Sequence, residues 1–217
     1  MASHRQIVGN PAGGHRSIVS MRFRLTRHLS HGLIGILMTV SQAAGMATEL
    51  IDDRRSGTLQ ASNGKTWRLV TDQVMGGVSR GSLQPAQVAG RPCLRLSGAV
   101  STERRGGFIQ LALDLADQHF DASGFDGIEI QVYGNEEMYN LHLRTSDLWL
   151  PWQSYRTEFL ATDHWQTLRA PFTAMTPYRT HKPFHPDHLT RLALVAIGRE
   201  FNADLCVGQV RFYRSEG

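Results

Sequence analysis

The sequence predicts an all-β protein, an antiparallel β-sandwich with jelly-roll topology. Many short segments alternate apolar and polar residues with a period of two, as strands do when they bury one face. Pairs of glycine, proline and asparagine separate these segments and supply turn chemistry. No window of helical length shows a clean 3.6-residue period. Many short strands with few helices are typical of a sandwich or a barrel, and the strand spacing suits a jelly roll.

About nine strands are expected from this alternation. It is clearest at residues 128–132 (IEIQV) and 139–144 (YNLHLR). The other candidates lie near residues 67–73, 93–98, 108–113, 154–160, 165–170, 191–197 and 205–213. No repeat or linker interrupts residues 60–214, so the strands are expected to form one domain.

The composition fits one domain with a substantial core and offers no strong bulk charge. The chain has 217 residues, with 23 basic and 19 acidic side chains. Five of the arginines and none of the acids fall within residues 1–47. The rest is nearly neutral, so nothing in the bulk charge favours binding to nucleic acid or to anionic lipid.

Residues 1–47 are predicted to be a targeting segment that lies outside the fold. From Met21 they show a basic stretch, an apolar run at residues 33–40 that is too short to span a bilayer, and small residues suited to cleavage. This pattern predicts a signal peptide that starts at Met21, a mature domain at residues 48–217 and a periplasmic or secreted protein. No stable membrane insertion is expected after the leader is removed. A mitochondrial transit peptide is the alternative, because the segment is arginine-rich and free of acids.

Two cysteines, Cys93 and Cys206, lie near opposite ends of the expected domain. In an oxidising compartment they could form a disulfide, and in a reducing one they would be small buried apolar groups. The chain has no C-x-x-C motif, so redox catalysis and a cysteine zinc site lack support.

Residues 77–81 (GVSRG) match the G-x-S-x-G pattern of serine hydrolases. That mechanism needs a helix directly after the serine, yet Pro85, Gly90 and Pro92 follow. The glycines are better explained by positive φ angles or by close approach of another backbone. No P-loop and no dinucleotide G-x-G-x-x-G is present. We therefore expect no catalytic residue and no cofactor.

Several motifs in order resemble the complex I intermediate-associated protein 30 family, over residues from about 67 to 212. They are Trp67, DQVMGGVS (72–79), GGF (106–108), FDGI (125–128), YNLHLRT (139–145), SY (154–155), WQ (165–166) and PF (171–172). The resemblance implies a galactose-binding-like jelly roll and a non-catalytic factor that helps to assemble respiratory complex I. The secretory leader departs from the mitochondrial pattern, so the resemblance transfers the fold better than the role.

The best candidate for a binding face is residues 144–155 (RTSDLWLPWQSY). Its candidate ligand- or partner-binding residues are Arg144, Asp147, Trp149, Trp152 and Tyr155. Aromatic faces stack on sugar rings or partner side chains, and Arg and Asp supply directional hydrogen bonds. The alternative is that the two tryptophans cap the core.

Asp72 and Ser79 lie at either end of the glycine turn. Short polar side chains in turns often bond to local backbone, and the family resemblance also makes these two residues candidates for the rim of a site. His181, His185 and His188 lie close in sequence, but intervening prolines prevent the helix that would align them, so no metal site is expected. The expected function is binding of a protein partner, as an assembly or interaction factor. The alternative is a periplasmic carbohydrate-binding module.

Overall fold

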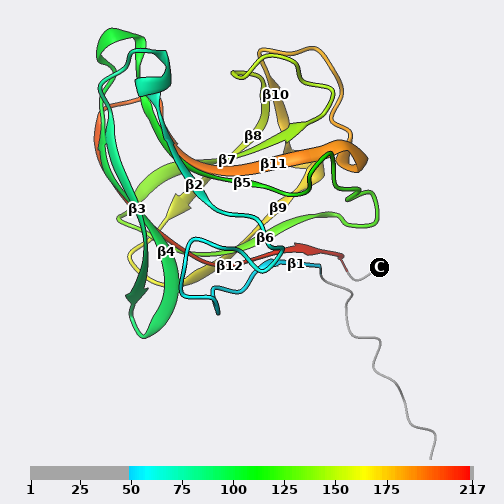
Figure 1. Cartoon of the computed structure of the whole chain (residues 1–217), viewed down its shortest axis with the longest axis horizontal. Helices are drawn as coiled ribbons and strands as arrows, with labels where there is room; N and C mark the ends of the chain where they lie inside the picture. Colours follow the sequence, from blue (N-terminus) through cyan, green and yellow to red (C-terminus); the bar gives the residue numbers. More distant parts are fainter. Residues whose placement is uncertain (1–48, 216–217) are drawn as a thin grey trace, which may run out of the picture. The chain divides into compact units, whose positions relative to one another are not determined.

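The computed structural model describes residues 49–215, so the predicted leader and its start at Met21 lie outside the described residues. These residues form two six-stranded antiparallel sheets that pack face to face, with no α-helix (Figure 1). The predicted fold class, an antiparallel β-sandwich of the jelly-roll, galactose-binding-like type, is confirmed. Within the described range, no helix is long and apolar enough to cross a membrane.

The first sheet has the order β3-β4-β12-β6-β9, and β1 also pairs with β12. Its strands are β1 (Leu50–Asp52), β3 (Arg80–Val88), β4 (Arg91–Val100), β6 (Gly127–Tyr133), β9 (Gln166–Pro171) and β12 (Phe201–Tyr213). The register of β12 against β6 shifts between Val207 and Val210. On its other side, the first part of the long strand β12 pairs with β4, and a later part pairs with β1.

The second sheet has the order β10-β8-β7-β11-β5-β2. Its strands are β2 (Arg68–Thr71), β5 (Phe108–Asp114), β7 (Glu137–Thr145), β8 (Ser154–Ala161), β10 (Thr176–Tyr178) and β11 (Leu189–Ile197). Four short 3-10 helices lie between strands: η1 (Asp72–Met75), η2 (Glu103–Arg105), η3 (Phe172–Ala174) and η4 (Pro186–His188).

All nine predicted strand segments contain a strand, but β1, β3 and β10 were not predicted. Strand β3 was missed because Gly81 and Pro85 indicated a loop. Pro85 is tolerated there because β3 is the edge strand of its sheet, where one side of the strand makes no ladder hydrogen bonds. Residues 67–73 are a strand only to Thr71, after which the chain turns into η1.

Alternate residues of both sheets fill one apolar core. Leu111, Leu141 and Leu194 enter it from the second sheet, and Leu96 and Ile130 from the first. This is the arrangement that period-two alternation predicts for two stacked sheets.

A covalent link and a buried ion pair add to this core. The sulfurs of Cys93 and Cys206 are bonded, joining β4 to β12 with a Cα–Cα distance of 5.5 Å. Near β1, Trp67 is buried and its indole Nε1 donates a hydrogen bond to Asp52 over 2.6 Å. Asp52 also forms a buried ion pair with Arg54.

Candidate functional site

The two predicted residues of the glycine turn, Asp72 and Ser79, are fully buried. The Ser79 hydroxyl donates to Asp72 Oδ2 over 2.5 Å, and the Ser79 N–H donates to Oδ1 over 3.0 Å. From the neighbouring loop, the Gly107 N–H donates to Oδ2 over 2.6 Å. The Asp72 carboxylate thus joins two loops that are distant in sequence.

The glycines around this carboxylate leave room for it. A Cβ atom on Gly77 or on Gly106 would collide with the Asp72 side chain. Gly76 has a φ of 85° at the end of η1, in the left-handed region that favours glycine. Both glycine motifs, GG at residues 76–77 and GGF at residues 106–108, therefore make room for the same Asp72 carboxylate. The order of residues in the sequence did not reveal this relation.

This cluster has the chemistry of a structural link. Burial alone would raise the pKa of the Asp72 carboxyl, but hydrogen bonds from the Ser79 side chain and from backbone N–H groups together lower it. The Ser79 hydroxyl also accepts a hydrogen bond from the Ser101 N–H over 2.9 Å. A buried hydroxyl held in this way differs from the exposed nucleophile of a G-x-S-x-G turn.

The most prominent exposed feature is the aromatic loop, residues 146–153 between β7 and β8. Arg144, at the end of β7, donates to four backbone carbonyls of this segment, those of Leu148, Leu150, Pro151 and Gln153. The closest of these contacts is 2.6 Å, to Gln153. The guanidinium acts as a central support, because one rigid group satisfies carbonyls along the whole loop.

This support presents apolar side chains to solvent. Trp149 is 85% exposed, Trp152 46% and Leu150 42%. Trp149 therefore does not cap the core, which was the alternative role for the tryptophans. Large apolar side chains gathered at a surface typically mark a binding site.

The other predicted residues of this segment hold the loop in place. Tyr155 is fully buried, and its hydroxyl donates to the Pro183 carbonyl over 2.7 Å. Asp147 contacts His188 Nδ1 at 3.0 Å. That contact with Asp147 is the main cause of a raised pKa at His188. The structure thus brings Arg144, Asp147 and Tyr155 together as the frame of the loop that exposes the tryptophans.

Of the three histidines singled out in the sequence, His185 and His188 have rings that lie close together. The ring of His188 lies 5.6 Å from that of His185 and 5.7 Å from that of His119, measured between centroids. A different trio, Glu136, Asp163 and His164, places three potential metal-ligand atoms within 4.8 Å of one another, with all three residues exposed. Sequence reasoning missed this trio because a β-hairpin connects its members.

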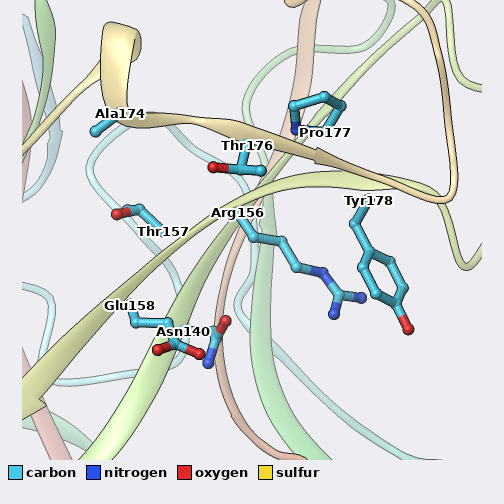
Figure 2. A pocket seen from close by; sticks show the side chains of 8 residues that line it. All are labelled: Asn140, Arg156, Thr157, Glu158, Ala174, Thr176, Pro177 and Tyr178. Carbon is cyan, nitrogen blue, oxygen red and sulfur yellow. The ribbon is translucent and has the colours of Figure 1, made fainter.

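Beside the loop, the outer face of the second sheet carries a hollow of about 510 Å³ (Figure 2). The residues that line it come mainly from β7, β8 and β10: Asn140, Arg156, Thr157, Glu158, Ala174, Thr176, Pro177 and Tyr178. Gln153 of the aromatic loop donates to the Arg179 carbonyl directly after β10, over 3.1 Å. The loop and the hollow are therefore neighbouring parts of one surface.

Arg156 and Tyr178 dominate one end of the hollow. Figure 2 shows the Arg156 guanidinium directed at the Tyr178 ring, and its Cζ lies 3.5 Å from the ring centroid. Arg156 Nε also donates to Ser154 Oγ over 2.8 Å. Arg156 lies in an expected strand, but no strand is expected at Tyr178, and only the pairing of β8 with β10 brings the two side chains together.

His142 lies on the same face, directly opposite Arg156 in the ladder. It is only 8% exposed, and its Nε2 has no hydrogen-bond partner within residues 49–215. Burial, reinforced by the charge of Arg156, lowers the pKa of His142 to about 3. The imidazole is therefore neutral at ordinary pH.

The fold and this surface define a galactose-binding-like β-sandwich with an exposed aromatic loop beside a polar hollow. The family model of complex I intermediate-associated protein 30 matches residues 58–204. The chain belongs to this family. No curated protein matches the sequence.

Solved structures of low identity share the fold. The family 11 carbohydrate-binding module of cellulase Lic26A-Cel5E from Clostridium thermocellum aligns with a TM-score of 0.63 and 12% identity, covering 79% of this chain and 97% of the module. A family 11 module from the same organism, in complex with a β-1,3-1,4-mixed-linked tetrasaccharide, gives a TM-score of 0.61 and 11% identity over 79% and 98% of the two chains. An exo-β-agarase gives 0.52 and 10% identity over 78% of this chain and 26% of the enzyme.

Proposed function

We propose that this protein is a non-catalytic binding module that recognises a protein partner through the aromatic loop and so acts as an assembly or interaction factor. The observation that carries this proposal is the exposure of Trp149, Leu150 and Trp152 on a loop held by Arg144. Tryptophan is enriched among residues that dominate binding energy, and a pre-ordered loop loses little entropy on binding. The name of the family supports an assembly role.

Photo-crosslinking tests this proposal. A crosslinking residue beside the aromatic loop, for example at Gln153, is used to capture partners in the native envelope fraction, and mass spectrometry identifies them. We expect a defined partner that the wild type captures and the double variant Trp149→Ala/Trp152→Ala loses. Leu160→Ala is the matched control, because Leu160 is a 43% exposed apolar residue of β8 outside the loop. Identical capture by all three proteins would contradict the proposal.

The second candidate is a carbohydrate-binding module. The hollow favours it, because guanidinium, amide, carboxylate and hydroxyl groups line a volume that suits a small ligand, and the aromatic loop contacts Arg179 directly after β10. The fold shared with family 11 modules is compatible with this role. A glycan array probed with the wild type and with Trp149→Ala tests this candidate. Silence across the array would remove it.

We propose that the mature protein lies in the periplasm or outside the cell, on the basis of the predicted leader. The bond between Cys93 and Cys206 supports this location, because disulfides persist in oxidising compartments. A mitochondrial location through a transit peptide is the alternative. Amino-terminal sequencing of the native protein after cell fractionation distinguishes the two.

A further inference from the structure

We propose that the hollow beside Arg156 binds an acidic polysaccharide, one whose sugar units carry carboxylate groups. The inference rests on the second candidate function, glycan binding, and specifies that the glycan is negatively charged. It is carried by the arrangement of charges on the outer face of the second sheet.

Charge compensation on this face is uneven. At the β5 side, Arg68 and Arg191 both pair with Asp114, at 2.6 and 2.7 Å. At the β8–β10 side, no carboxylate of residues 49–215 lies within ion-pair distance of Arg156 or Arg179, although both guanidinium groups lie near the ring of Tyr178. Arg156 therefore contributes a positive charge with no ion-pair partner among the described residues, although Glu158 also lines the hollow.

Arg156 is built to receive a planar anion. The Tyr178 ring and Ser154 Oγ hold its guanidinium in place. Partial burial lowers the pKa of Arg156, which means that its charge is incompletely solvated. A desolvated cation gains most from a counter-ion, and a carboxylate matches a guanidinium through two parallel hydrogen bonds.

The remaining residues favour a sugar over an acidic peptide. Asn140 and Glu158 face each other across β7 and β8, and Thr176 lies opposite Arg156 on β10. Glu158 can accept hydrogen bonds from sugar hydroxyls, which a poly-acidic peptide lacks. A uronic acid sugar offers one carboxylate and several hydroxyls, which matches one unpaired guanidinium among amide, hydroxyl and carboxylate groups.

Affinity electrophoresis of the whole mature protein tests the inference, with polygalacturonate, neutral mixed-linkage β-glucan and poly-glutamate as probes. We expect retardation by polygalacturonate, weakened by added salt, and little by the other two polymers. Arg156→Gln should weaken binding to polygalacturonate about tenfold. Arg156→Lys should recover only part of the loss, because lysine keeps the charge but not the planar fork.

Arg191→Gln is the matched control, because it removes one positive charge from the same face outside the hollow. It should bind polygalacturonate as the wild type does. Equal losses in Arg156→Gln and Arg191→Gln, or equal binding to poly-glutamate, would overturn the inference. Binding to neutral β-glucan that is unchanged in Arg156→Gln would overturn it while leaving the glycan candidate intact. Binding to no glycan would remove both and leave the protein-partner proposal standing.

Discussion

At the scale of single residues, one carboxylate explains why two glycine motifs occur together. Asp72 accepts hydrogen bonds from Ser79 and from the Gly107 N–H. One glycine of each pair, Gly77 and Gly106, lies so close to its side chain that a Cβ atom would collide with it. An ionised carboxylate accepts donors at both of its oxygens, whereas an amide accepts at one and donates from its nitrogen. The part of the sequence that looked most like an enzyme signature is therefore a structural junction.

We expect Asp72→Asn to lower the free energy of unfolding by about 3 kcal/mol, because the amide turns a donor group toward buried donors. Urea denaturation at neutral pH measures this effect. Asp163→Asn, at a 75% exposed side chain, should stay within about 0.5 kcal/mol of the wild type. A difference of less than about 1 kcal/mol between the two variants would contradict the structural role.

The buried imidazole of His142 predicts a specific pH dependence. Its pKa in the folded protein is about 3, below the ordinary value of 6.5, so the unfolded chain binds more protons between these values. The contribution of neutral His142 to the free energy of unfolding is fully present above about pH 6.5. It falls by about 1.4 kcal/mol for each pH unit as the pH is lowered toward 3. His142→Gln should remove this part of the slope in urea denaturation from about pH 6.5 to 4.5. His164→Gln, at an exposed site, should keep the wild-type slope.

At the scale of elements, the aromatic loop shows how one side chain can order a segment without secondary structure. Arg144 lies at the end of β7 and donates to carbonyls from Leu148 to Gln153. Its support leaves the tryptophans free to project into solvent. The presentation of the candidate binding surface therefore depends on a residue beneath it.

We expect Arg144→Met to loosen the loop while the sandwich stays folded, because the carbonyls lose their shared donor. Hydrogen exchange in residues 146–153 should speed up about tenfold, and exchange in β11 should not change. Arg68→Met, which removes an arginine paired with Asp114 on the same sheet, is the control. Unchanged exchange in the loop of Arg144→Met would show that other contacts hold it.

The edges of both sheets carry proline. Pro85 lies in β3 and Pro177 in the three-residue strand β10, and both strands end their sheets. Proline and short length protect an edge from pairing with other chains. The same residues made these strands hard to predict, because proline in a sequence indicates a turn before it indicates an edge.

At the scale of the whole molecule, the disulfide closes a long covalent loop. Cys93 and Cys206 are 113 positions apart, and their strands are neighbours in the first sheet. A link across so long a loop restricts the unfolded chain strongly. The protein that forms this bond should be clearly more stable than its reduced form.

We expect the double variant Cys93→Ala/Cys206→Ala to lose about 4 kcal/mol of unfolding free energy. Dithiothreitol should lower the midpoint of urea denaturation of the wild type and leave that of the variant unchanged. An identical midpoint for the wild type with and without reductant would contradict a stabilising bond in the isolated protein.

Much of the fold follows from local pattern. Residues 128–132 and 139–144 alternate so regularly that their strands and their inward faces were predictable from the chain alone. Alternation also placed Asn140 and His142 on the outward face of β7. A period of two specifies which side of a strand is apolar, and burial of that side requires a second layer.

The candidate site was only partly predictable. The segment from Arg144 to Tyr155 was found because aromatic and charged residues cluster in sequence, but its division into a buried frame and exposed tryptophans was not. The proximity of Arg156, Tyr178 and His142 gave no signal, because it depends on which strands pair and in which register.

The sequence by itself determined the class of the fold, the faces of its main strands and the segment that carries the tryptophans, because these depend on residues near one another in the chain. Only the tertiary structure decided that Asp72 holds two glycine loops together, that Cys93 meets Cys206, and that a guanidinium without a carboxylate partner within residues 49–215 faces a hollow beside the aromatic loop. Those relations join residues that are distant in sequence, and strand order and register are set by the packing of the whole core.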